Sequence, residues 1–148
     1  MKAALIIIAL LLAVFGLWFW LVPGPTKLNQ IDHIWPGGSS ARPVVVHNIG
    51  YGSIDDRVDK ARQAYDVYYP DDVGGAKDAS DCNGRTYPAL VFFHGGSWRD
   101  GDKASYAFVG REFAKRGFFT FVADYRKVPD HLFPDFVADA ARAIADIH

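Results

Sequence analysis

Apolar and polar positions divide the chain into a long apolar run, a polar stretch, and a second part in which short apolar runs alternate with polar segments. The first run, Ala3–Val22, contains no charged residue. A helix of that length, at about 1.5 Å per residue, spans the roughly 30 Å hydrocarbon core of a bilayer. Lys2 precedes the run, which favours a cytoplasmic amino terminus. The pattern predicts a single-pass transmembrane helix over residues 3–22, with the remaining chain on the extracytoplasmic (periplasmic or extracellular) side.

A cleaved signal peptide is the alternative interpretation of this run. The run is long and ends in Trp-Phe-Trp-Leu-Val-Pro without a small-x-small cleavage site, so an uncleaved anchor is favoured. Residues 23–43 are rich in Pro, Gly, Ser and Asn and lack apolar periodicity, which predicts a linker. Trp35 in this stretch is either exposed or covers an edge of the following domain.

From residue 44 onward, the spacing of apolar positions predicts an α/β domain extending to residue 148. Two runs are typical of strands and form a plausible antiparallel pair, Val44–His47 and Gln63–Tyr69. The apolar run Ala89–Phe93 predicts a buried strand, and Phe118–Val122 predicts another. The helix expected between them makes a right-handed βαβ unit with parallel strands. The expected helices are Lys103–Arg116, capped by Asp102 and stopped by Gly117, and Phe133–His148.

Composition and charge narrow the possible partners. The formal net charge is -1, so nothing in the charge balance points to nucleic acid. Cys82 is the only cysteine, which excludes an intramolecular disulfide and leaves no partner thiol for a metal site. No metal or cofactor is expected.

The segment His94-Gly95-Gly96 carries the chemistry that the sequence suggests. Two glycines at the end of a strand let the backbone turn sharply and approach a ligand, because no Cβ blocks the way. The amides freed by such a turn can face an oxygen that is gaining negative charge, which is the chemistry of an oxyanion hole. A simple strand-to-helix turn that binds nothing is the alternative.

Three segments in the same order resemble one family. The sequence His-Gly-Gly-Ser-Trp at residues 94–98 resembles the oxyanion motif of α/β-hydrolases of the esterase, lipase and feruloyl-esterase group. Residues 124–134 are similar to the Tyr-Arg-x-x-Pro segment that follows the fourth strand in that family, and residues 65–70 are similar to its Asp-Val-Tyr-x-Pro second strand. Together these matches cover roughly residues 44–148.

The resemblance implies a role for each residue of the motifs. The amides of Gly95 and Gly96, with Ser97 as a further donor, are expected to bind the carbonyl oxygen of a small ester or acyl substrate. His94 is expected to hold the turn by hydrogen bonding, and Trp98 to form a wall of the pocket or to pack. Two further residues are expected to support the motif, Tyr125 as a donor or as plain core and Arg126 as a structural ion-pair or loop-bonding residue.

The catalytic triad of the family is missing from this sequence. No Gly-x-Ser-x-Gly occurs, and the nearest approach, Gly37–Ala41, lies in the predicted linker. Ser97 would attack from the wrong side of the oxyanion loop. The histidines at 33, 47, 94, 131 and 148 all precede the place where the family puts its base. We therefore expect an incomplete α/β-hydrolase sheet of about four strands and two helices, truncated before the nucleophile elbow and preceded by a transmembrane helix.

The function expected from this combination is the front half of a membrane-anchored serine hydrolase acting on carboxylic esters. Its nucleophile, acid and histidine would come from other sequence, and the 148-residue chain alone is expected to be inactive. An amidase or peptidase on the same scaffold is an alternative, because the motif serves both ester and amide carbonyls. A non-catalytic, membrane-tethered interaction domain is the alternative from another class. A Gly-x-Ser-x-Gly encoded further downstream would favour the enzyme.

Overall fold

The fold was analysed in a computed structural model that describes residues 2–32, 45–51, 62–73 and 85–148. Helices and strands alternate along most of the chain, as the apolar pattern predicts. In chain order they are α1 (Lys2–Leu21), α2 (Gly24–Asp32), β1 (Val45–Gly50), β2 (Ala64–Tyr68), the 3-10 helix η1 (Asp71–Val73), β3 (Ala89–Phe93), the 3-10 helix η3 (Lys103–Tyr106), α3 (Ala107–Ala114), β4 (Phe119–Ala123) and α4 (Asp135–Ile147).

The four strands form one mixed sheet in the order β1-β2-β4-β3. β1 and β2 are antiparallel, with a register shift between Val46 and Ile49, and β2 is antiparallel to β4. β3 and β4 run parallel, with Phe93 opposite Ala123 at their carboxyl ends. The predicted antiparallel pair and the predicted parallel βαβ unit are both confirmed.

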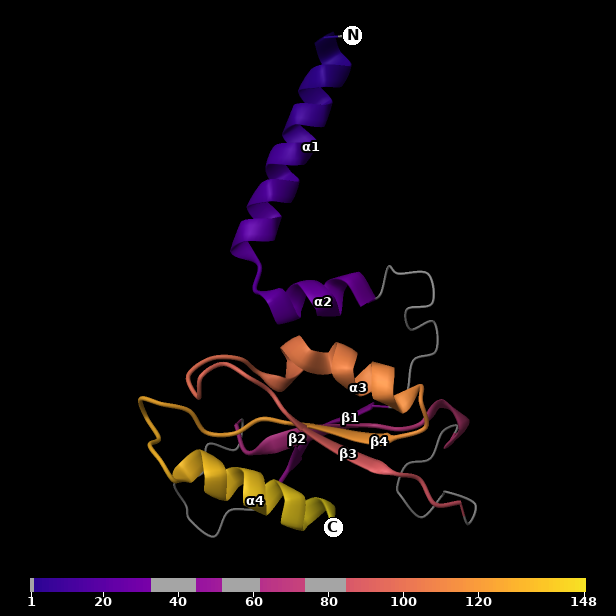
Figure 1. The fold of residues 1–148 in the computed structure, drawn as a ribbon, viewed down its shortest axis with the longest axis vertical. Coiled ribbons are helices and arrows are strands. Elements are labelled where there is room, and N and C mark those ends of the chain that lie inside the picture. The colour runs from indigo at the N-terminus through magenta and orange to yellow at the C-terminus, as the bar shows by residue number, and fades with distance from the viewer. Residues whose placement is uncertain (1, 33–44, 52–61, 74–84) are drawn as a thin grey trace.

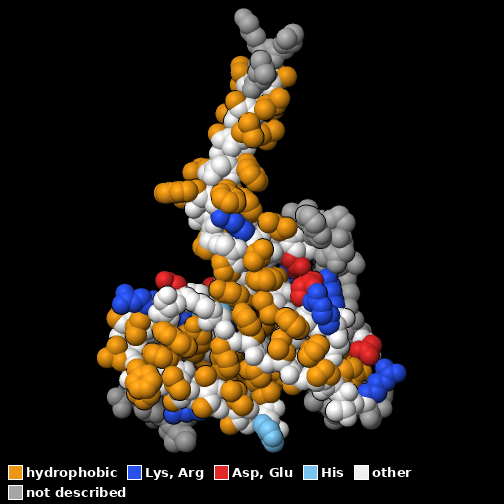
Figure 2. Space-filling model, viewed as in Figure 1, with side chains coloured by type: hydrophobic (Ala, Val, Ile, Leu, Met, Phe, Trp, Pro, Cys, Tyr) orange, Lys and Arg blue, Asp and Glu red, His pale blue; other side chains and the backbone are white. Residues whose placement is uncertain are grey.

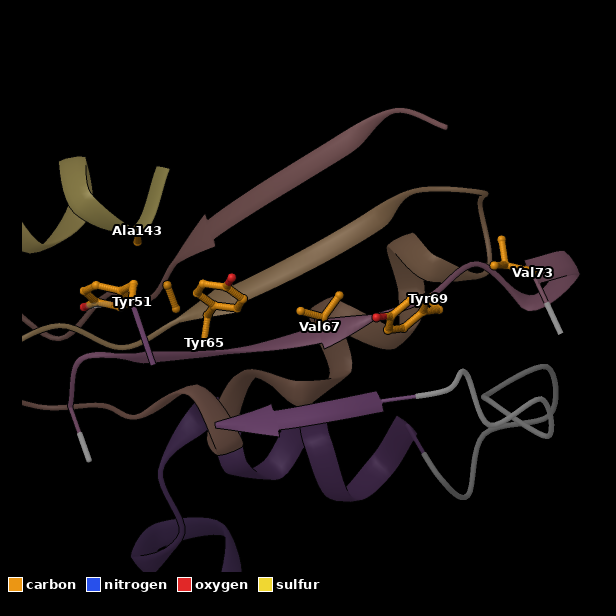
Figure 3. Packing of buried hydrophobic residues seen from close by; sticks show 7 residues of the cluster. Tyr51, Tyr65, Val67, Tyr69, Val73 and Ala143 are labelled. Carbon is orange, nitrogen blue, oxygen red and sulfur yellow. The ribbon is translucent and has the colours of Figure 1, made fainter. Parts of the chain in front are cut away.

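Helices cover both faces of the sheet (Figure 1). α3 lies on one face with α2 across it, α4 lies on the other face, and α1 projects away from the domain. Alternate side chains of β2 point to opposite faces, so Tyr65 and Val67 join the core beneath α4 while Tyr68 packs on the α3 side. Figure 3 shows the first of these two cores, in which Ala143 of α4 approaches the ring of Tyr51.

The predicted helix over residues 103–116 is present in two parts. It begins as the 3-10 helix η3, where the Asp102 carboxylate accepts a hydrogen bond from the backbone N–H of Ser105 at 2.8 Å. It continues as α3 and ends before Gly117, whose φ of 84° is the left-handed conformation that favours glycine. The last helix begins at Asp135, directly after Pro134.

β3 is less buried than the sequence suggests. Ala89 is exposed and the other four residues of the strand are half-buried. The reason is the strand order, because β3 lies at the end of the described sheet and pairs with a neighbour on one side only. An apolar run alone does not distinguish a central strand from an edge strand.

The predicted transmembrane helix is wrong. Residues 2–21 are helical, but the part of the chain that the structure describes contains no helix long and apolar enough to cross a bilayer. The fold class is therefore corrected to an α/β sheet domain preceded by the helices α1 and α2. Large apolar side chains along α1 are exposed (Figure 2).

Part of the stretch predicted as a linker is helical. α2 occupies residues 24–32, with Pro25 near its start, where proline is well tolerated because the first N–H groups of a helix have no partner within it. Three further features of the sequence lie outside the described residues: Trp35, Gly37–Ala41 and Cys82.

Candidate oxyanion site

A tight turn follows β3 and includes the three residues with positive φ next to one another. Gly96 has φ 136°, Ser97 has φ 54° and Trp98 has φ 62°. A Cβ on Gly96 would lie 2.0 Å from the carbonyl oxygen of Asp100, so only glycine fits this position. Left-handed conformations at two non-glycine residues in a row are uncommon, and such strain is typical of functional sites.

The hydrogen bonds of the turn leave several N–H groups unused. The carbonyl of Gly96 accepts from the backbone N–H of Arg99 at 3.0 Å and of Asp100 at 2.9 Å, which closes the turn. Among the described residues, none accepts a hydrogen bond from the N–H of Gly95, Gly96 or Ser97. Unpaired amides at the end of a strand are the donors that an oxyanion hole requires.

A pocket of about 530 Å³ adjoins the turn. Gly95 and Gly96 both line it, whereas Ser97 does not. A Cβ on Gly95 would meet only the hydroxyl oxygen of Tyr106, at 4.0 Å, so the backbone of Gly95 is accessible from the pocket. The turn thus offers two glycine amides beside a space large enough for a small organic ligand.

His94 connects the turn to the neighbouring strand. Its side chain is buried, with Nε2 2.8 Å from Oδ1 of Asp124 and Nδ1 2.8 Å from the carbonyl oxygen of Gly95. Gly101 packs against the same ring, where a Cβ would lie 2.6 Å from Nδ1. These contacts fix the orientation of Gly95.

Asp124, at the carboxyl end of β4, fastens both ends of the loop that contains the turn. Its Oδ1 contacts His94 at the start of the loop and accepts from the backbone N–H of Lys103 at the end, at 3.1 Å. Nζ of Lys127 lies 3.6 Å from the same oxygen and donates to the carbonyl of Gly101. Because the carboxylate is itself nearly buried, its contacts hold the loop in one geometry.

Two aromatic residues, Tyr125 and Trp98, lie between the glycine turn and α4. The hydroxyl of Tyr125 donates to the carbonyl of His94 at 2.6 Å, and the two rings stack with centroids 4.6 Å apart. Burial, followed by the nearby charge of Asp124, raises the pKa of Tyr125, so the hydroxyl keeps its proton and remains a donor. Trp98 is half exposed and stacks on Phe136 of α4 at 4.5 Å.

Arg126 forms a two-pronged ion pair with Asp139 of α4. Nε and Nη2 each lie 2.8 Å from a carboxylate oxygen of Asp139, and Gln63 donates to the same carboxylate at 2.8 Å. Burial alone would raise the pKa of Asp139, but the hydrogen bonds from Arg126 and Gln63 outweigh it and hold the pKa below its usual value. The pair joins the segment after β4 to the helix that follows it.

Four residues of the site were not predicted from the sequence: Asp124, Gly101, Lys103 and Lys127. A signal was present for Asp124, because an acidic residue directly after a buried strand is positioned at the same sheet edge as the glycine turn. No signal pointed to the other three, whose roles depend on how the loop folds back. The contribution of Pro23, Pro25 and Thr26 to the pocket wall was equally invisible, since about 70 residues separate them from the turn.

Comparisons with known proteins find esterases among the similar sequences and structures. The family model named BD-FAE matches residues 79–147. Two proteins of Oryza sativa subsp. japonica, each described as a probable isoprenylcysteine alpha-carbonyl methylesterase, are 34% identical to the chain. One match covers 59% of this chain and 18% of the relative, and the other covers 68% and 20%. The chain thus spans about a fifth of the length of the curated relatives that it matches.

Solved structures share the fold. Esterase B from Lactobacillus rhamnosis superposes with a TM-score of 0.58 at 18% identity, over 99% of this chain and 40% of the esterase. A truncated carbohydrate esterase from gut microbiota superposes with a TM-score of 0.53 at 24% identity, over 70% of this chain and 32% of that chain. At these identities the likeness concerns the fold alone. Taken with the sequence matches, it supports the resemblance of the chain to esterases of the α/β-hydrolase superfamily.

Proposed function

We propose that the chain supplies the oxyanion hole of a carboxylic-ester hydrolase. The observation that carries the proposal is the pair of glycine amides, on Gly95 and Gly96, that lack an acceptor among the described residues and adjoin a pocket. Amides fixed in this way act on the carbonyl oxygen of an ester, and their hydrogen bonds strengthen as negative charge develops there. The isoprenylcysteine methylesterase relatives support an ester rather than an amide as the substrate.

The residues around the turn act as its supports. Asp124 and His94 fix the carbonyl of Gly95, while Tyr125 holds the carbonyl of His94, so the amides keep their direction before the substrate binds. A donor that is already oriented pays no reorganisation cost during the reaction, which is the main source of its effect. The nucleophile, its general base and the orienting acid of the acyl-enzyme mechanism would lie outside residues 1–148, since these contain no Gly-x-Ser-x-Gly.

The test is hydrolysis of p-nitrophenyl butyrate by the product of the natural open reading frame that contains this chain. We expect turnover by that protein and none by residues 1–148 alone. Gly96→Ala should lower kcat/KM by about 100-fold or more, because it displaces an oxyanion donor. Gly117→Ala is the matched control, since it also places alanine at a positive φ but far from the turn, and it should leave kcat/KM unchanged.

A second variant distinguishes an effect on the oxyanion donors from a loss of the folded structure. Tyr125→Phe removes only the hydroxyl, which donates to the carbonyl of His94 and lies 3.5 Å from its Nδ1, and should lower kcat by about tenfold with little change in KM. Absence of ester hydrolysis by the natural product, or full activity in both Gly96→Ala and Tyr125→Phe, would refute the proposed function.

A further inference from the structure

The pocket beside the glycine turn has a wall that comes from a distant part of the chain. Pro23, Pro25 and Thr26, at the start of α2, line it together with Gly95 and Gly96. Tyr106 of η3 lines the same pocket, and its hydroxyl is the atom nearest to the position of a Cβ on Gly95. A ligand oxygen at the glycine amides would therefore have α2 and Tyr106 as neighbours.

α2 is fastened at its carboxyl end by an arginine of α3. Nε of Arg111 lies 2.7 Å from Oδ2 of Asp32, and Nη2 lies 2.6 Å from Oδ1 of Asn29. The side chains of Arg111 and Asp32 are each only 11% exposed, so water does not compete strongly for this pair. A shielded arginine with two fixed partners determines geometry more strongly than an exposed ion pair does.

α2 is also fastened to η3, through Thr26 in its first turn and through Asn29. Oγ1 of Thr26 lies 3.4 Å from Oγ of Ser105, and the side-chain amide of Asn29 donates to the carbonyl of Ala104 at 3.3 Å. η3 is itself capped by Asp102, which belongs to the same pocket. α2 is thus attached to η3 and α3, the elements that directly follow the glycine turn. Figure 1 shows α2 lying across α3.

We propose that α2 is the specificity-determining wall of the ester pocket and that Arg111 is the positioning residue that holds it in place. An aliphatic acyl or alcohol group of a few carbons lies against Pro23 and Pro25 while its carbonyl oxygen faces Gly95 and Gly96. Asp100 and Asp102 also line this space, and the Asp102 carboxylate accepts hydrogen bonds from the backbone N–H and the hydroxyl of Ser105. This inference rests on the function proposed above.

The wall is tested with carboxylates of increasing length, which resemble the acid product of ester hydrolysis. Acetate and hexanoate carry the same charge, so the contribution of that charge cancels in the ratio of their dissociation constants. Each methylene that becomes buried strengthens binding by roughly fourfold. With α2 in place, we expect the full 148-residue chain to bind hexanoate at least about tenfold more tightly than acetate, measured by titration followed by NMR.

Removing the contact between Arg111 and α2 should remove the preference for hexanoate over acetate. Arg111→Leu is expected to reduce the ratio to about twofold and to increase hydrogen exchange in α2. Arg116→Leu is the matched control, because Arg116 follows the same helix but is exposed and pairs with Glu112. It should leave both the ratio and the exchange unchanged.

A disulfide between α2 and η3 distinguishes the loss of the α2 wall from a general loss of stability. Thr26→Cys and Ser105→Cys place sulfur atoms where the two hydroxyl oxygens lie 3.4 Å apart, in a Cys82→Ser background. The crosslink should form on oxidation and restore the preference for hexanoate in Arg111→Leu, and reduction should abolish it again. Restoration would not occur if Arg111 served only to keep the domain folded.

The outcomes distinguish the two proposals. If both carboxylates bind but the ratio is the same in the original chain, Arg111→Leu and the crosslinked form, the wall is refuted and the proposed function stands. If neither carboxylate binds any of these forms, the proposed function fails, and the wall fails with it. A crosslink that does not form would show that α2 does not dock on η3, which also refutes the wall.

Discussion

Gly96 is the residue on which the geometry of the turn depends. Its φ of 136° and the 2.0 Å that would separate a Cβ from the Asp100 carbonyl oxygen leave no room for any other side chain. Gly95 has a different environment, with only the Tyr106 hydroxyl near its Cβ position, at 4.0 Å. The sequence analysis predicted a turn from the two adjacent glycines, but the sequence could not show that only the second of them is required by close contact.

We expect Gly96→Ala to destabilise the domain much more than Gly117→Ala. Both changes place alanine at a positive φ, which costs about 1 kcal/mol. Gly117 has no atom within 4 Å of its Cβ position, whereas Gly96 must also displace backbone atoms of the same loop. Urea unfolding should therefore give a loss of about 1 kcal/mol for Gly117→Ala and at least about 3 kcal/mol for Gly96→Ala. Equal losses would mean that the turn is looser than described.

At the scale of elements, the edge formed by the ends of β3 and β4 carries the site. β3 delivers His94 and the glycines, and β4 delivers Asp124 and Tyr125, because the two strands are parallel and end together. This arrangement was predictable from the apolar runs and from the helix expected between them. The docking of α2 was not, since it depends on which elements become neighbours in space rather than on local pattern.

The ion pair between Arg126 and Asp139 should make stability depend on pH in a narrow acidic range. Asp139 has its pKa held below the ordinary value near 3.9, so the unfolded chain binds a proton more readily than the folded one. The stabilisation is fully present above about pH 4 and is lost as the pH falls through the folded pKa. The free energy of unfolding, measured by urea titration from pH 6 to pH 2, should therefore decrease more steeply in the original chain than in Asp139→Asn.

The same variant should lose stability at neutral pH. Asp139→Asn leaves Arg126 without its charged partner in a buried place, which costs about 3 kcal/mol. Asp135→Asn is a suitable control on the same helix, since Asp135 is partly exposed, lies 3.9 Å from Arg126 and 3.2 Å from His131, and should cost less than about 1 kcal/mol. Similar losses in the two variants would contradict the structural role of the buried pair.

In the whole molecule, the role proposed for each group follows from its position in the fold. The described domain places two glycine amides beside a pocket and braces them with His94, Asp124 and Tyr125. The family and the position of the turn were predictable because three short motifs occur in order. The membrane-spanning helix was predicted wrongly, and the extracytoplasmic location predicted with it stays an untested prediction. That prediction rested on the length and apolar content of residues 3–22 and on Lys2 before them. Among the described residues, no helix is long and apolar enough to cross a bilayer.

The most direct test of the central claim is an NMR titration of the ¹⁵N-labelled chain with butyrate. A carboxylate presents a negatively charged oxygen, so it reports on the donors that would face an ester carbonyl. We expect the amide resonances of Gly95 and Gly96 to move most, with downfield proton shifts that saturate, and we expect Gly96→Ala to abolish the effect. Saturable shifts confined to other residues, or no shift at either glycine, would contradict it.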